Sequence, residues 1–156
     1  MIIRNYQEAD CRAIADLFHA AVHAIDDTQY SAAQREAWAP TPPEYGSWRR
    51  RLAETQPWVA EHNGATVGFI ELEPHGHIDC LYVHPAFQRR GIAGRLLHHL
   101  LGQARDLGIT QLSVEASKPA RAFFEAHGFR LQSENRVIRR GQVLVNSTLV
   151  LMLGAE

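Results

Sequence analysis

The stretch "HPAFQRRGIAGRLLHHLLGQA", residues 84–104, decides the fold of this chain. Apolar residues recur in it at every third or fourth position, which predicts a helix over residues 91–107. A helix start presents unpaired N–H groups and a partial positive charge, and Gly91 lets another group approach the backbone closely. The segment "QRRGIAG", residues 88–94, therefore predicts an anion site with phosphate as a natural occupant. The alternative is a solvated, arginine-rich turn whose glycine serves packing alone.

The composition is that of one globular domain. The chain has 156 residues, of which 46% are hydrophobic and 21% charged, and its formal net charge of −1 gives no electrostatic footprint for nucleic acid. Cys11 and Cys80 fit no disulfide framework and are expected to be buried free thiols. Neither a signal peptide nor an apolar run of about 18 residues is visible. We expect a single cytoplasmic domain over residues 1–156 with no membrane contact.

Periodicity places the remaining elements. Their order is one strand, two or three helices, three strands, a helix, a strand, a helix and two strands, which predicts a mixed α/β fold with a βαβ unit in the middle. The three arginines at 49–51 are expected on a solvated helix face. Strands are predicted over residues 1–4, 58–62, 66–73, 77–83, 112–116, 129–139 and 143–153, and helices over 9–25, 31–38, 43–54, 91–107 and 119–127.

Two motifs together resemble the GCN5-related N-acetyltransferase (GNAT) family. The run Gln88-Arg89-Arg90-Gly91-Ile92-Ala93 fits the family signature Q/R-x-x-G-x-G/A between a strand and a helix, and it has neither the GK[ST] of a P-loop nor a G-x-G-x-x-G. The segment "SKPARAFFEAHGF", residues 117–129, resembles a second family region at the usual separation. The resemblance covers essentially the whole chain. It implies a mixed, mostly antiparallel sheet of about seven strands, flanked by helices and splayed between strands four and five.

The same resemblance implies a site for acetyl-CoA in that splay. The main chain of residues 81–83 is expected to pair with the pantetheine arm, and the amides of residues 89–94 to hold the pyrophosphate. Many members carry a tyrosine that protonates the leaving thiolate where this chain has Phe124, so Tyr82, Ser117 or water must substitute. The expected cofactor-binding residues are Leu81, Tyr82, Val83, Gln88, Arg89, Arg90, Gly91, Ile92, Ala93, Gly94, Ser117, Ala120, Phe123 and Phe124.

A base must remove a proton from the acceptor amine before attack on the thioester. His77, Asp79 and Glu115 are the candidates, and each has an alternative. His77 also fits a solvated turn, Asp79 could orient the substrate amine or pair with an arginine, and Glu115, as a buried carboxylate, could have a purely structural partner. Strand alternation puts His77 and Asp79 on one face and Ile78 and Cys80 on the other, unless a bulge disturbs it.

The acceptor pocket of this fold is built by the first helices, the loop after them and the last strands. Aromatic side chains gather in the corresponding segments, which suits a small amine with an apolar body, although the same residues also serve as ordinary core. The expected acceptor-binding residues are His23, Tyr30, Trp38, Tyr45 and Trp48. No metal site is expected, because His75-x-His77 lacks a matching pair and His98-His99 diverge on a helix.

The sequence thus predicts an acetyl-CoA-dependent N-acetyltransferase acting on a primary amine of a small molecule or peptide in a ternary complex. The alternative is an acyl-CoA-binding sensor of the same fold, suggested by Phe124 in place of tyrosine. Turnover across a panel of amines separates the two. Edge strands of this fold often pair across a dimer, so a homodimer is compatible with the sequence, which fixes neither the acceptor nor the oligomeric state.

Overall fold

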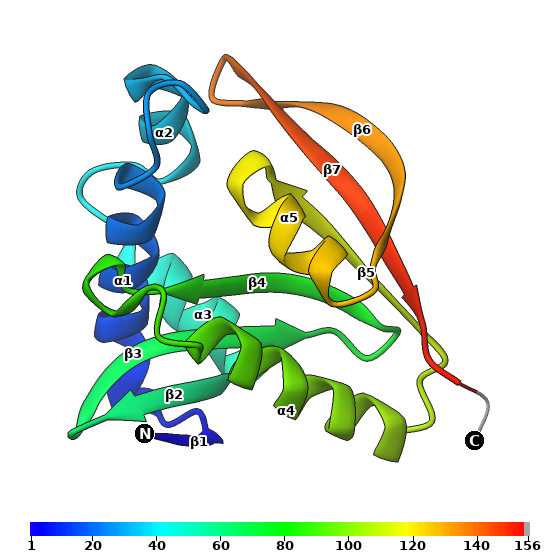
Figure 1. The fold of residues 1–156 in the computed structure, drawn as a ribbon. Helices are drawn as coiled ribbons and strands as arrows, with labels where there is room; N and C mark the ends of the chain where they lie inside the picture. Colours follow the sequence, from blue (N-terminus) through cyan, green and yellow to red (C-terminus); the bar gives the residue numbers. More distant parts are fainter. Residues whose placement is uncertain (155–156) are drawn as a thin grey trace.

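The computed structural model describes residues 1–154 and contains one seven-stranded sheet with helices on both faces (Figure 1). The strands are β1 (Ile2–Asn5), β2 (Trp58–His62), β3 (Ala65–Leu72), β4 (His77–Val83), β5 (Gln111–Ser117), β6 (Arg130–Arg139) and β7 (Gln142–Met152). The helices are α1 (Cys11–His23), α2 (Ala32–Trp38), α3 (Tyr45–Thr55), α4 (Ile92–Asp106) and α5 (Lys118–Ala126), with short 3-10 turns at Glu8–Asp10 and Pro85–Phe87.

The order of strands in the sheet is β1-β2-β3-β4-β5-β7-β6, and every pairing is antiparallel except that of β4 with β5. This arrangement confirms the predicted mixed α/β class. Two-residue turns close the β2–β3 and β6–β7 hairpins. Asn63 and Gly64 in one turn, and Arg140 and Gly141 in the other, all have positive φ, as tight hairpin turns that match the twist of their strands require.

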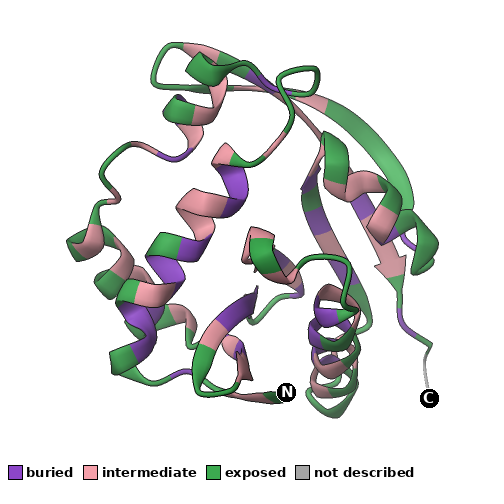
Figure 2. Cartoon of the chain, turned by 60° about the vertical axis from the view of Figure 1, so that its left-hand side comes forward, coloured by how far each residue is buried: buried purple, intermediate pink, exposed green. Residues whose placement is uncertain are grey.

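Two apolar cores lie on opposite faces of the sheet. Alternation along β3 sends Phe69 to the core shared with α1 and α3, and Ile70 to the core shared with α4 and α5. The buried stripe of α4, which includes Leu96, Leu97 and Leu100, follows the predicted helical spacing. Figure 2 shows buried segments on helices at both faces, whereas β6 at the edge is mostly exposed.

The sheet opens between β4 and β5. These strands pair only at His77 with Ser113 and at Ile78 with Val114, and beyond this point they diverge (Figure 1). The β5 strand continues to pair with β7 as far as Ser117. Within residues 1–154, the backbone of β4 after Ile78 therefore has no strand partner on its β5 side, which is the splay that the resemblance predicts.

A bulge in β4 corrects the simple alternation expected for that strand. Ile70 pairs with Leu81 and Leu72 with Ile78, so one residue of β3 faces two of β4, Asp79 and Cys80. As a result Ile78 packs in the α4 core while Cys80 packs in the α1 core, and the two do not share a face. The bulge also directs Asp79 and Cys80 together toward α3, where both contact Arg51.

Both cysteines are buried and unpaired, as predicted. Helix boundaries shift by a few residues from those expected: α1 ends at His23 rather than residue 25, and α3 begins at Tyr45 after a proline-rich connection. Within residues 1–154, no helix combines the length and the apolar character that crossing a membrane requires.

Candidate active site

The turn before α4 has the geometry of an anion site. Arg89 and Gly91 both have positive φ, and Gly91 stands at the N-cap of the helix. Within residues 1–154, no side chain accepts a hydrogen bond as a cap for the first amides of α4. A Cβ built on Gly91 would meet no atom within 4 Å, so the approach to these amides is open. Unpaired amides at a helix start with an open approach suit a phosphate group.

A cavity of about 630 Å³ leads from this turn along the open edge of β4. The start of α5 forms its other side, and Gln88 fixes the turn by donating from its side-chain Nε2 to the carbonyl oxygen of Val83, at 3.2 Å. Of the predicted cofactor residues, Leu81, Tyr82, Val83, Gln88, Arg89, Ala93, Ser117, Ala120, Phe123 and Phe124 line this cavity.

The other predicted cofactor residues lie close by without lining the cavity. Gly91 and Gly94 belong to the turn and the first turn of α4, and Ile92 is buried in the core. Arg90 stacks its guanidinium on the ring of Phe87, 5.0 Å from the ring centroid. Residues from the loop after α1, including Ile25 and Gln29, line the cavity as well. No motif in the sequence marks them, because they approach from a distant segment.

A second cavity of about 560 Å³ lies on the other side of the gap, and it shares Tyr82 and Ser117 with the first. These two residues therefore stand where the two cavities meet. The second cavity has aromatic walls and a charged floor. Its lining residues are Phe18, Tyr30, Trp38, Arg51, Asp79, Cys80, Tyr82, Glu115, Ser117, Val137, Arg139, Leu144 and Asn146.

The predicted acceptor residues are divided between several places. Tyr30 and Trp38 line the second cavity, and Trp48 lines an adjoining cavity of about 240 Å³ that also includes Trp38 and Arg51. His23 and Tyr45 line none of these three cavities. His23 contacts the carbonyl oxygen of Ala39, and the Tyr45 hydroxyl donates to Asp16.

The Tyr30 hydroxyl joins three segments. It donates to the carbonyl oxygen of Val145 at 2.6 Å and accepts from the backbone N–H of Lys118 at 3.0 Å. Lys118 also donates from its ammonium group to the carbonyl oxygen of Gln29, at 3.0 Å. The hydroxyl thus ties the loop after α1 to β7 and to the start of α5, and the ring faces the cavity as part of its wall.

Arg51 corrects the expectation of a solvated face for residues 49–51. Its guanidinium donates to Glu71 at 2.6 Å and to Asp79 at 2.7 Å, and Thr55 donates to Glu71 at 2.6 Å. Glu71 is fully buried, and a buried carboxylate requires a cation or several donors. Glu71 stands near the end of the otherwise apolar segment "TVGFIEL", residues 66–72. This acidic residue was the one sign in the sequence that a basic partner lies opposite.

The side chains of Glu73, His77 and Glu115 form a hydrogen-bonded triad. The His77 ring lies between the two carboxylates, with Nδ1 at 2.5 Å from Glu73 and Nε2 at 2.5 Å from Glu115. Burial lowers the pKa of His77, but the contacts with both carboxylates outweigh it and raise the pKa above its ordinary value. His77 has no free ring nitrogen in this arrangement and does not line the second cavity, whereas Asp79 and Glu115 do.

This hydrogen-bonded triad gives a prediction for the pH dependence of stability. A histidine whose pKa is raised by folding stabilises the protein fully below its unfolded value, near 6.5, and the contribution is lost as pH rises through the folded value. Between pH 6 and 9 the free energy of unfolding of the wild type should therefore fall by about 1 kcal/mol more than that of His77→Gln. Urea denaturation at each pH measures this difference.

The matched control is His75→Gln, which removes a neighbouring exposed imidazole and should keep the wild-type pH dependence. Parallel stability curves for the wild type and His77→Gln would show that the two carboxylates do not stabilise the imidazolium.

Burial determines the state of two further groups. It raises the pKa of the Cys80 thiol well above its ordinary value, so this sulfur stays protonated and is no nucleophile at neutral pH. Burial also raises the pKa of Tyr82, a residue that lines both cavities, so its hydroxyl retains its proton at neutral pH. Phe124 is buried against Phe129 and has no proton to donate.

The splayed sheet, the open helix start and the two neighbouring cavities form the arrangement that the resemblance to acyl-CoA-dependent transferases predicts. The model of the acetyltransferase (GNAT) domain matches residues 26–151, so the chain belongs to the GNAT family. It is similar to the uncharacterized N-acetyltransferase YafP of Escherichia coli, with 38% identity over 92% of this chain and 91% of YafP. It is also similar to the L-amino acid N-acyltransferase MnaT of the same organism, with 32% identity over 69% of this chain and 65% of MnaT.

The crystal structure of a GCN5-related N-acetyltransferase from Rhodopseudomonas palustris superposes with a TM-score of 0.92 at 32% identity, covering 97% of this chain and 95% of that one. With family membership established, the protein is an N-acetyltransferase of the GNAT type.

Proposed function

We propose that this enzyme acetylates the primary amine of a small, amino-acid-like acceptor, with donor and acceptor bound together on opposite sides of the β4–β5 gap. The observation that carries the proposal is the meeting of two cavities at Tyr82 and Ser117, where the two strands part. Two sites that share these residues hold two substrates in contact, and positioning of this kind supplies much of the rate enhancement of such reactions.

The first cavity fits acetyl-CoA in shape and chemistry. The unpaired edge of β4 at residues 81–83 offers main-chain groups to an extended arm, and the start of α4 offers amides to a diphosphate. Phe123 and Ala120 on α5 give the apolar side of the cleft. When bound there, acetyl-CoA supplies a thioester carbonyl that is open to attack by an unprotonated amine.

The second cavity suits an acceptor that carries an ammonium group, a carboxylate and an apolar side chain. Asp79 and Glu115 suit an ammonium group, and Arg51 and Arg139 suit a carboxylate. Within residues 1–154 Arg139 has no ion-pair partner, so its guanidinium is available to a ligand. The aromatic walls suit an apolar side chain. The name of MnaT, an L-amino acid N-acyltransferase, agrees in substrate class.

The side chains that accept and donate protons are proposed from their positions in the cavities and their charges. Glu115 lines the acceptor cavity at the gap, and we propose that it takes the proton of the acceptor ammonium. His77, held between Glu115 and Glu73, fixes the orientation of that carboxylate. Asp79 is paired with Arg51 and is the weaker candidate. Tyr82 keeps its proton at the junction and replaces the tyrosine that position 124 lacks as donor to the leaving thiolate.

The test compares two acceptors that differ only in a carboxylate, together with a peptide. Release of free thiol from acetyl-CoA is measured with L-phenylalanine, 2-phenylethylamine and a lysine-containing peptide. We expect kcat/KM for the amino acid to exceed that for the decarboxylated amine about tenfold, which corresponds to one charge-assisted hydrogen bond. Arg139→Gln should remove that advantage. The matched control is Arg136→Gln on the same strand, because Arg136 does not line the cavity.

Equal turnover of the amine without a carboxylate would contradict the amino-acid-like acceptor, and preference for the peptide would place the acceptor in the peptide class. A rise in melting temperature with CoA but no thiol release from any amine would instead support the acyl-CoA sensor.

A further inference from the structure

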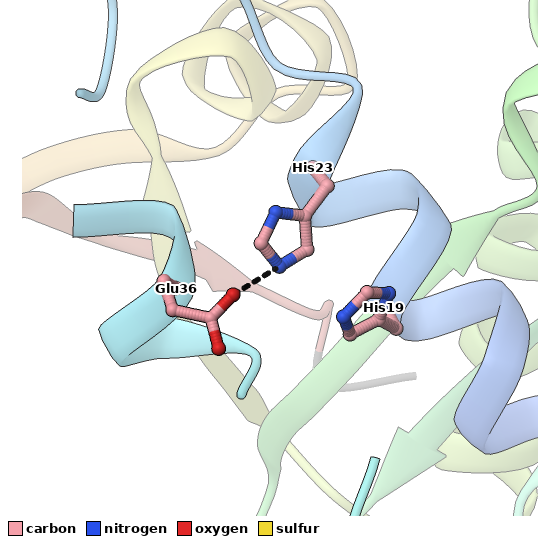
Figure 3. Close-up of side chains that lie close together, drawn as sticks. All are labelled: His19, His23 and Glu36. Carbon is pink, nitrogen blue, oxygen red and sulfur yellow. Dashed lines mark ion pairs between the residues drawn. The ribbon is translucent and has the colours of Figure 1, made fainter. Parts of the chain in front are cut away.

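Two histidines and a glutamate cluster on the outer side of α1, outside both substrate cavities that meet at the gap. His19 and His23 stand one turn apart on α1, and Glu36 reaches them from α2 (Figure 3). Their ligand atoms, one from each residue, all lie within 4.8 Å of one another. Figure 3 shows the imidazole rings and the carboxylate turned toward a common point. No step of the proposed acetyl transfer uses this cluster.

The cluster is connected to the segment that follows α2. His23 Nε2 lies 2.7 Å from the carbonyl oxygen of Ala39 and 3.8 Å from the carboxylate of Glu36. His19 Nε2 lies 2.7 Å from the hydroxyl oxygen of Thr41, which donates to Glu36 at 2.8 Å. The cluster therefore contains two imidazoles, one carboxylate and two further oxygens, drawn from α1, α2 and the loop that joins α2 to α3.

The two imidazole rings of the cluster lie close together. The rings of His19 and His23 lie with their centroids 4.2 Å apart, an arrangement that two positive charges would oppose. Neutral imidazole is the form that binds a metal ion. Because a carbonyl oxygen only accepts, Nε2 of His23 donates to Ala39 in the metal-free protein, and ligation through Nε2 would move this proton to Nδ1 and replace that contact.

We propose that His19, His23 and Glu36 form a binding site for a divalent metal ion of the Zn²⁺ type. Two imidazole nitrogens and one carboxylate oxygen are a known set of three zinc ligands, with a fourth position left for water or the Thr41 hydroxyl. Donor atoms around tetrahedral zinc lie about 3.3 Å apart, given bonds of about 2.0–2.2 Å. The separation of 3.8 Å between His23 and Glu36 reaches this value by small side-chain rotations.

Occupation of this site has a consequence for the acceptor side of the enzyme. A metal ion would bind α1 to α2 and thereby fix the segment that begins at Trp38. Trp38, Ala39, Pro40 and His19 itself line the cavity of about 240 Å³ beside the acceptor cavity. The metal thus acts on the wall of the acceptor region and takes no part in the chemistry at the β4–β5 gap.

The experiment uses the full chain without a histidine tag. Co²⁺ is added at pH 7.5 and the visible absorption is recorded, because four- and five-coordinate Co²⁺ absorbs far more strongly than the hexa-aqua ion. Isothermal titration with Zn²⁺ gives the stoichiometry and affinity. We expect one ion per chain, the Co²⁺ bands, and a rise in melting temperature of about 5–10 °C at a zinc concentration 100 times Kd.

Variants distinguish this cluster from the one other group of potential ligands in residues 1–154, Glu73, His77 and Asp79. His23→Gln and Glu36→Gln should each weaken Zn²⁺ binding by at least about tenfold, in line with the loss of a ligand. His77→Gln is the matched control and should leave it unchanged. Each variant must retain its CoA-induced rise in melting temperature, which shows that it folds.

Three outcomes overturn the proposal. They are the absence of Co²⁺ bands in the wild-type protein, a loss of Zn²⁺ binding in His77→Gln alone, and undiminished binding in both cluster variants. The first depends on no variant, so a folding defect cannot rescue the proposal. Failure of this site would leave the proposed acetyl transfer intact, because the acceptor panel tests that separately.

Discussion

Replacement of Gly91 by glutamate is expected to abolish CoA binding while the fold survives. The substitution places a negative charge beside the amides that are proposed to hold a diphosphate, and repulsion of this kind costs several kcal/mol, or about 1,000-fold in affinity. A side chain at this position meets no atom within 4 Å, so sterics in the free protein are not the cause. The positive φ of Gly91 adds strain of about 1 kcal/mol. Isothermal titration with CoA measures the loss.

The matched control is Gly102→Glu, which adds the same charge to the same helix at an exposed position that is also open within 4 Å. It should bind CoA as the wild type does. Gly91→Ala, which carries the strain without the charge, should retain most of the affinity. Normal CoA affinity in Gly91→Glu would place the diphosphate elsewhere.

Replacement of Glu115 by glutamine is expected to lower kcat by about 100- to 10,000-fold, the usual contribution of a positioned base. The amide keeps the shape of the carboxylate but cannot accept a proton at neutral pH. Because Glu115 lines the acceptor cavity and not the donor cavity, the affinity for CoA should be unchanged. Steady-state kinetics with saturating acetyl-CoA and titration with CoA provide the two measurements.

Glu73→Gln is the control, since it removes the other carboxylate on His77 from outside the cavity. It should lower kcat less than about tenfold. If Asp79→Asn loses activity while Glu115→Gln keeps it, the base is Asp79 and the proposed assignment is wrong.

Local features of this protein could be predicted from its sequence. The stripe of α4 depends on residues close together in the chain, and it forms as expected. The hairpin turn at Asn63-Gly64 and the capping box of Ser31 and Gln34 are local in the same sense. The phosphate turn is local as well, because a glycine before an apolar helix specifies both the backbone conformation and the free amides. The proposed place of the cofactor therefore followed from two short motifs.

The acceptor side could not be predicted in the same way. The bulge in β4 depends on pairing with β3, and it reverses the faces of Ile78 and Cys80 that simple alternation gives. Arg51 reads as one of three solvated arginines until Glu71 and Asp79 are found opposite it. The i, i+4 spacing of His19 and His23 was visible in the sequence, but Glu36 joins them only through the packing of α2 on α1.

The sequence by itself determined the helices and strands, the family, and the turn at residues 88–94 that is proposed to hold the diphosphate. Each of these depends on torsions and periodicities within a few residues. Tertiary structure alone decided which charges share a cavity. Arg51, Asp79 and Glu115 come from three different helices and strands. Whether their charges attract or repel one another, or are left to interact with a ligand, depends on the distances between them in the folded protein, and these distances cannot be derived from the sequence.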